Sequence, residues 1–300
     1  MTGLRRGVIL WAPIMKADKI WALVLMGGGA RGLAHVGVLR VLEKNGLVPD
    51  IVAGTSMGAI VGGLYAAGLT GAKMTEMLGG LNLTSYSDKP ARAKLFKRPK
   101  NLFEYVMISD YKNRFFGKMG LDKEDAIEAY LKSCVGDVRI EDLPIKFVCN
   151  AVDLVSGKEV VFTEGKLTKA LRATISLPLV FAPVRMKGKL LLDGGVLNSA
   201  PVEAAKAAGA EVTVLVDIHR PLKKMPPERI KNTFQVVQRM IDVAWAAAYE
   251  ERARRADFVL RVPVDLGILD FSDTRRITMR GERVAAANLQ ALKNAIGAGP

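Results

Sequence analysis

The residues best suited to chemistry are a serine and its flanking glycines in residues 54–58, Gly-Thr-Ser-Met-Gly. This G-x-S-x-G pattern is typical of a sharp turn from a strand into a helix, which holds the serine in a strained backbone conformation. Amide groups and the helix dipole at that end favour developing negative charge. The pattern therefore predicts Ser56 as a nucleophile between Gly54 and Gly58. A tight strand-to-helix turn without any chemistry also fits these five residues.

A second loop, residues 27–32 with the sequence Gly-Gly-Gly-Ala-Arg-Gly, also lies between a predicted strand and a predicted helix. Consecutive glycines leave backbone amides open to an anion, either a phosphate or a tetrahedral oxyanion. Taken alone, the G-x-G-x-x-G spacing also suggests a dinucleotide-binding fold. That fold uses an acidic residue at the end of the second strand to hold a ribose. Here Asp50 begins that strand and Ser56 follows its end, which favours the oxyanion interpretation.

A serine nucleophile needs a base, and the sequence offers two kinds. Asp193 follows an apolar strand and precedes two glycines, and a desolvated carboxylate can accept the serine proton directly because burial raises its pKa. His219 follows a later strand, and the order Ser56, Asp193, His219 would suit the triad of an α/β-hydrolase. His35 and His219 also have purely structural interpretations, in a helix and in a loop. The residue types alone leave the dyad and the triad both open.

The elements that must position these residues alternate between strand and helix, which is typical of a parallel α/β sheet. Apolar periodicity predicts strands at residues 21–26, 50–53, 145–151, 159–162, 189–192, 212–218 and 258–262. It predicts helices at residues 33–45, 57–67, 123–134, 202–208, 229–255 and 281–295. No internal repeat or low-complexity linker interrupts the chain, so we expect one domain.

Three blocks, residues 27–32, 54–58 and 193–195, occur in this order and resemble the defining blocks of the patatin-like phospholipases, especially the bacterial ones. The likeness continues in residues 31–39, 173–183 and 193–202, and it runs from about Trp21 to the last helix. Met26 stands where the family often has a glycine or an acidic residue, and Ser199 where a second asparagine is usual. Neither departure touches the proposed chemistry.

The resemblance implies a three-layer α/β/α fold whose mainly parallel central sheet is flanked by helices. A single domain would span residues 21–296, after an N-terminal extension at residues 1–20. It implies a lipid acyl hydrolase of phospholipase A or lysophospholipase type, with no metal and no cofactor. The rival functions are an esterase with a Ser56–Asp193–His219 triad and a non-enzymatic nucleotide- or lipid-binding module.

The resemblance also assigns roles to residues. Ser56 and Asp193 would form a catalytic dyad that excludes His35 and His219. The amides of Gly28 and Gly29 would form the oxyanion hole, with Ala30 as a further candidate donor. Arg31 is expected to order the glycine loop. The remaining motif positions are Gly27, Gly32, Gly54, Gly58, Gly194 and Gly195.

The chain carries a formal net charge of +14, which suits contact with an anionic lipid surface or solubility alone. No zinc-finger, RNA-recognition or helix-turn-helix pattern occurs, so nucleic acid is not expected. Basic and aromatic residues interleave over residues 88–120, which predicts a cap-like segment at a membrane surface, or a solvated cap with its own small core. Two cysteines without a disulfide pattern and no apolar run of membrane-spanning length favour the cytoplasm, with peripheral membrane contact in addition.

Overall fold

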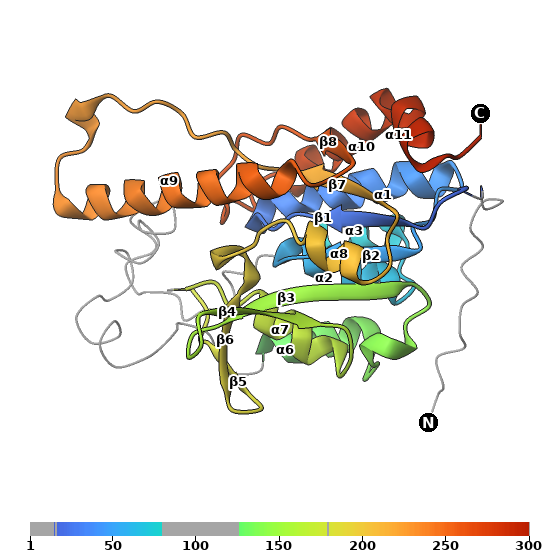
Figure 1. Cartoon of the computed structure of the whole chain (residues 1–300), viewed down its shortest axis with the longest axis horizontal. Coiled ribbons are helices and arrows are strands. Elements are labelled where there is room, and N and C mark those ends of the chain that lie inside the picture. Colours follow the sequence, from blue (N-terminus) through green and yellow to red (C-terminus); the bar gives the residue numbers. More distant parts are fainter. Residues whose placement is uncertain (1–14, 16, 80–125, 179, 300) are drawn as a thin grey trace.

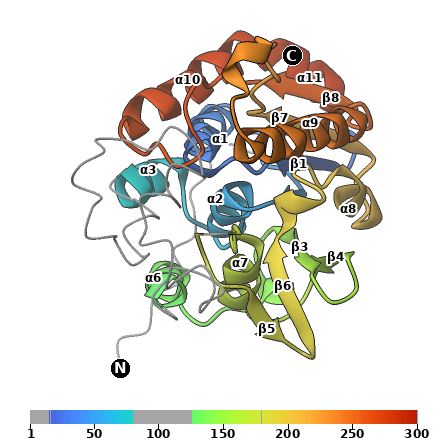
Figure 2. The ribbon, with the colours of Figure 1, turned by 90° about the vertical axis from the view of Figure 1, so that its left-hand side faces the viewer.

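The computed structural model describes residues 15, 17–79, 126–178 and 180–299. Most of the predicted extension at residues 1–20 and all of the predicted cap at residues 88–120 lie outside these ranges, so both stay predictions. The described residues form one eight-stranded sheet with helices on both faces. Figure 2 shows α2 and α7 on one side of this sheet and α8 on the other. The predicted three-layer α/β/α arrangement is confirmed.

The sheet has the strand order β5-β6-β3-β2-β1-β7-β8, and β4 also pairs with β3. Neighbours along the run from β3 to β8 are parallel, whereas β4 and β6 pair with β3 in the antiparallel sense, as do β5 and β6 with each other. The strands are β1 Trp21–Leu25, β2 Ile51–Gly54, β3 Lys146–Asp153, β4 Lys158–Phe162, β5 Val184–Met186, β6 Lys189–Asp193, β7 Val212–Asp217 and β8 Phe258–Arg261. The central strands β1, β2 and β7 are buried along their whole length, as expected of parallel strands covered on both faces.

The α-helices surround this sheet and cover its apolar faces. They are α1 Ala34–Lys44, α2 Met57–Ala66, α3 Gly71–Gly79, α6 Ala126–Val135, α7 Leu167–Thr174, α8 Val202–Ala207, α9 Thr233–Ala253, α10 Thr274–Ala287 and α11 Leu289–Ile296. Short 3-10 helices are η1 Gly29–Leu33, η3 Ile140–Asp142, η4 Gly194–Val196 and η5 Pro227–Arg229. Within the described ranges, no helix combines the length and the apolar composition that crossing a bilayer requires.

The prediction of the last helix was wrong in its limits. A single helix was expected over residues 281–295, but α10 begins at Thr274 and α11 follows it at Leu289. Gly281 lies inside α10, where a β-carbon would come within 1.9 Å of the carbonyl oxygen of Ala34 in α1. This glycine therefore marks a close crossing of two helix backbones and not the start of a helix.

Candidate active site

Ser56 stands at the turn between β2 and α2 with φ 54° and ψ −124°. Among the described residues other than glycine, only Ser56 and Lys187 have a positive φ, a conformation that costs free energy and often marks functional sites. Neighbouring backbone atoms come so close to Gly54 and Gly58 that neither position has room for a side chain. A β-carbon on Gly58 would lie 2.1 Å from the carbonyl oxygen of Leu25, and one on Gly54 2.6 Å from the carbonyl oxygen of Gly58. The two glycines thus let the turn press against β1 and hold the serine at its apex.

The Ser56 side chain meets Asp193, which ends strand β6. The Ser56 hydroxyl donates a hydrogen bond to Asp193 Oδ2 at 2.7 Å. The second carboxylate oxygen, Oδ1, accepts the backbone N–H of Gly195 at 2.7 Å. The backbone N–H of Ser56 donates to Thr174 Oγ1 at 2.9 Å, which fixes the turn against the end of α7. The structure therefore brings together two residues that lie 137 positions apart in the chain.

Asp193 is almost fully buried, with 3% of its surface exposed. Burial raises the pKa of its carboxyl group to about 6, and the hydrogen bonds from Ser56 and Gly195 oppose part of that rise. A carboxylate with this pKa is ionised at neutral pH and still basic enough to take a proton from a nearby hydroxyl. The Ser56 hydroxyl thus lies in direct contact with a carboxylate that is able to act as a base.

The glycine loop lies beside Ser56, since a β-carbon on Gly27 would sit 3.4 Å from the Ser56 β-carbon. In the described part of the chain, no acceptor pairs with the amides of Gly28 and Gly29. The amide of Ala30 differs, because it donates to the carbonyl oxygen of Ile268 at 2.8 Å. Two of the three predicted donors therefore have no acceptor among the described residues, whereas the Ala30 amide fastens the loop to the segment around Ile268.

Arg31 contacts the same loop from the inside. Its Nε donates to the carbonyl oxygen of Gly28 at 3.3 Å. Burial and the nearby Arg220 lower its pKa to about 10, against the opposing charge of Asp217. The guanidinium remains charged at neutral pH and contacts the loop directly, and its role in ordering the loop stays a prediction.

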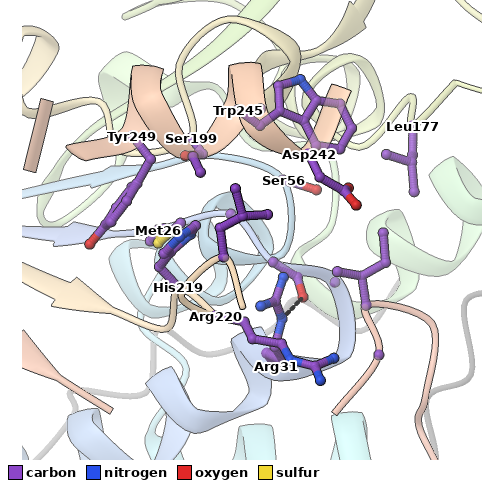
Figure 3. Close-up of a pocket in the computed structure, with 18 of the residues that line it drawn as sticks. Met26, Arg31, Ser56, Leu177, Ser199, His219, Arg220, Asp242, Trp245 and Tyr249 are labelled. Carbon is purple, nitrogen blue, oxygen red and sulfur yellow. Dashed lines mark hydrogen bonds between the residues drawn. The ribbon is translucent and has the colours of Figure 1, made fainter. Parts of the chain in front are cut away.

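The two histidines lie apart from the contact between Ser56 and Asp193. His35 is fully buried, and its Nε2 donates to the carbonyl oxygen of Met26 at 2.8 Å. Burial lowers its pKa to about 4, so the ring is neutral. The His219 ring stacks on Tyr249 with centroids 4.2 Å apart, and burial lowers its pKa as well. His219 lines the pocket (Figure 3), but both Asp193 oxygens already have other hydrogen-bond partners.

Replacing His219 by phenylalanine therefore separates the dyad from the triad. The phenyl ring can keep the stacking on Tyr249 while removing both ring nitrogens. A dyad in which Asp193 is the base predicts that kcat/KM for an ester substrate stays within a few-fold of the unmodified protein. Loss of a histidine base from a working triad costs about 10,000-fold or more. A steady-state assay of the His219→Phe variant distinguishes these outcomes, and a loss of that size would establish the triad.

A polar network behind the turn joins buried Thr55, Asn150 and Asn198 to the exposed Glu159. The Thr55 hydroxyl donates to Asn150 Oδ1 at 2.7 Å, and the Asn150 amide donates to the carbonyl oxygen of Asn198 at 2.9 Å. Glu159 Oε1 accepts from the side-chain amides of Asn150 and Asn198 at 2.6 and 2.9 Å. These bonds tie the turn of Ser56 to the segment that follows Asp193, and so help to hold Ser56 and Asp193 in their relative positions. Thr55 and Asn198 lie in the family-like blocks at residues 54–58 and 193–202, whereas Asn150 and Glu159 had no signal in the residue pattern.

Ser56 and Asp193 line a pocket of about 600 Å³. The glycine loop lines it as well, and much of the rest of its wall is apolar, including Leu177, Phe181 and Phe271. Helix α9 supplies an outer wall that was not predicted. Figure 3 shows Trp245, Asp242 and Tyr249 of this helix along one side of the pocket, opposite Arg31 and Arg220. In the described residues, no three His, Cys, Asp or Glu side chains gather as metal ligands.

The chain is similar to proteins of known families. The family model described as patatin-like phospholipase matches residues 23–206. An uncharacterized NTE family protein of Mycobacterium tuberculosis is 34% identical over 198 residues, which cover 66% of this chain and 49% of that protein. Lysophospholipase NTE1 of Lodderomyces elongisporus is 30% identical over 292 residues, which cover 87% of this chain and 18% of that protein. The chain thus spans about half of the first relative's length and less than a fifth of the second's.

The fold is similar to a solved structure as well. VipD from Legionella pneumophila superposes with a TM-score of 0.55 at 14% sequence identity, covering 93% of this chain and 67% of that one. At this identity the likeness concerns the fold alone. The family match covers more than half of the chain and includes the glycine loop, the turn of Ser56 and the segment around Asp193. The chain belongs to the patatin-like phospholipase family.

Proposed function

We propose that this chain is a serine hydrolase that cleaves carboxylic esters of lipids with a Ser56–Asp193 dyad. The observation that carries this proposal is the 2.7 Å hydrogen bond from the Ser56 hydroxyl to a buried carboxylate. The pKa of that carboxylate is raised to about 6, so it can act as the base. Membership of the patatin-like phospholipase family and a relative named lysophospholipase support a lipid ester as the substrate.

The first half of the reaction forms an acyl-enzyme. Asp193 Oδ2 takes the hydroxyl proton while Ser56 Oγ attacks the ester carbonyl carbon. The carbonyl oxygen becomes an oxyanion, which the amides of Gly28 and Gly29 stabilise by hydrogen bonds. The tetrahedral intermediate collapses when Asp193 returns its proton to the leaving alcohol. The acyl group is then bonded to Ser56 Oγ.

The second half releases the fatty acid. Asp193 takes a proton from water, and the resulting hydroxide attacks the acyl carbonyl carbon. The same two amides stabilise the second oxyanion. Asp193 then protonates Ser56 Oγ, which restores the resting site. One carboxylate therefore serves as base and acid in both halves, and its direct contact with Ser56 supports a dyad without an intervening imidazole.

The proposal is tested by fatty acid release from a panel of lysophospholipids, phospholipids and monoacylglycerols. We expect release from at least one of these lipids and no release by the Ser56→Ala variant. A protein that binds such lipids but hydrolyses no ester would be a non-catalytic lipid-binding member of the fold. Tight binding of a dinucleotide without esterase activity would support the rival nucleotide-binding module.

The raised pKa of Asp193 predicts how the rate depends on pH. The base acts as a carboxylate, so kcat/KM should rise with pH and level off above the pKa of about 6. Below that value, we expect about a tenfold fall for each pH unit, because one proton inactivates the site. Initial rates with a soluble short-chain ester between about pH 4.5 and 8.5 measure this. A rate that stays constant down to the lower limit would contradict the assignment.

A further inference from the structure

Helix α9 has two apolar sides, and only one of them faces the pocket. Trp245 and Tyr249 lie on the inner side and line the cavity. The outer side carries exposed valines and methionine, with Met240 61% and Val236 53% exposed. At 3.6 residues per turn, Val236, Met240 and Val243 fall on one line along the helix. Val243 is 47% exposed as well, and large apolar side chains left exposed together mark an interaction surface.

A basic segment accompanies this outer side. Figure 1 shows α9 reaching beyond the strands of the sheet, with the chain between β7 and α9 running back beside it. Arg239 ties the two together by donating to the carbonyl oxygen of Lys223 at 2.9 Å. Leu222 and Met225 of this segment are also exposed. Between His219 and Met240 the only acidic residue is Glu228, against Arg220, Lys223, Lys224, Arg229, Lys231 and Arg239.

We use the name docking face for the exposed apolar residues Leu222, Met225, Val236, Val237, Met240 and Val243 together with these six cations. The docking face adjoins the rim of the pocket. Leu222, Met225 and Arg229 line the same cavity as Ser56. A flat partner that covers the docking face would therefore lie across the route from solvent to the nucleophile.

We propose that the docking face binds an anionic lipid surface and so delivers the ester bond of a lipid from that surface to Ser56. Its chemistry matches such a surface: apolar side chains enter the acyl boundary, while lysine and arginine contact acidic headgroups. Arg220 and Lys223 pair with Asp265 at 2.9 and 3.5 Å. Among the described residues, no carboxylate pairs with the other four cations, Lys224, Arg229, Lys231 and Arg239, and an uncharged apolar partner would leave these four without counter-charges. The proposal rests on the proposed lipid hydrolase function and adds to it the surface on which the enzyme works.

The test measures vesicle binding separately from catalysis. The Ser56→Ala protein is floated with vesicles of phosphatidylcholine alone or with about 30% phosphatidylglycerol added. We expect binding to the acidic vesicles to be at least about tenfold tighter than binding to the neutral ones, and to weaken as salt is raised. Adding Val236→Asp and Met240→Asp should weaken binding to the acidic vesicles by about tenfold or more, because charged side chains would have to enter the boundary.

A matched control carries the same two changes elsewhere. Val155 and Met279 are exposed, at 75% and 49%, and neither lines the pocket. The Val155→Asp and Met279→Asp double variant, with the same net charge, should bind vesicles like its parent. In a protein that keeps Ser56, the Val236→Asp and Met240→Asp changes should leave the rate of hydrolysis of a soluble short-chain ester unchanged. The same changes should abolish hydrolysis of lipid in vesicles.

Two results would overturn the docking face. One is vesicle binding that does not depend on lipid charge, or that is unaffected by the Val236→Asp and Met240→Asp changes. The other is that the unmodified protein is a dimer, whereas the Val236→Asp and Met240→Asp variant is a monomer that still binds vesicles. The docking face would then be a contact between copies of the chain. If vesicles bind as expected but the unmodified protein hydrolyses no ester, the docking face is supported and the hydrolase function is refuted.

Discussion

Replacement of Asp193 by asparagine is expected to lower kcat/KM for ester hydrolysis by about 1,000-fold, since loss of a general base costs roughly 100- to 10,000-fold. Asparagine has nearly the same shape, so its Oδ1 can still accept the Gly195 N–H while its amide donates to Ser56 Oγ. The geometry of the turn is kept and only the proton acceptor is lost. Steady-state kinetics with a medium-chain p-nitrophenyl ester measure the effect, and retained activity would refute the dyad.

The thermal stability of this variant provides its control. The pKa of Asp193 is raised from 3.8 to about 6, so the folded state holds this proton more tightly than the unfolded state does. Its contribution to stability is full below pH about 4 and is lost as pH rises through about 6. The Asp193→Asn variant has no such proton, so we expect it to be at least as stable as the unmodified protein at pH 8. A large drop in Tm would instead attribute the lost activity to unfolding.

Ser56→Ala is expected to have the largest effect, a loss of about 10,000-fold or more, because no covalent intermediate can form. The change also removes the hydroxyl that donates to Asp193 Oδ2. The rate of ester hydrolysis measures the effect. Intact-mass spectrometry shows in addition whether an acylated protein accumulates. Alanine disfavours the positive φ of Ser56 no more than serine does, so the fold should survive.

The neighbouring pocket serine gives a matched control for Ser56→Ala. Ser199 also lines the cavity, and its carbonyl oxygen, not its hydroxyl, accepts the Gly27 N–H at 2.8 Å. Ser199→Ala should therefore stay within a few-fold of the unmodified protein. If Ser199→Ala were the inactive variant and Ser56→Ala the active one, the nucleophile would be misassigned.

The sequence allowed the prediction of the central part of the fold because its signals are local. Apolar runs gave strands β1, β2, β3 and β7 to within a few residues. The glycines at residues 54 and 58 predicted a turn whose tightness the structure explains by contacts with β1 and within α2. Asp193 was a candidate because it ends an apolar strand and precedes two glycines. The resemblance to a family then joined these separate signals into one site.

Other features depend on contacts between distant segments and left no local signal. Helix α7 and strand β5 were not predicted, although Thr174 of α7 holds the backbone of Ser56. The hydrogen bond from the Ala30 amide to the Ile268 carbonyl oxygen joins positions 238 residues apart. The outer pocket wall comes from α9, a helix that was predicted without a role. Periodicity identifies such a helix but does not say which of its sides meets the site.

Covalent labelling by a fluorophosphonate tests the central claim most directly, because an activated serine displaces its fluoride and the resulting phosphonate ester resembles the tetrahedral intermediate. Its rate is compared between the unmodified protein, Asp193→Asn and His219→Phe, and the modified residue is mapped by mass spectrometry. A Ser56–Asp193 dyad predicts a single adduct on Ser56, a rate that collapses in Asp193→Asn and a rate nearly unchanged in His219→Phe. An adduct on another residue, or labelling that depends on His219 and not on Asp193, would contradict it.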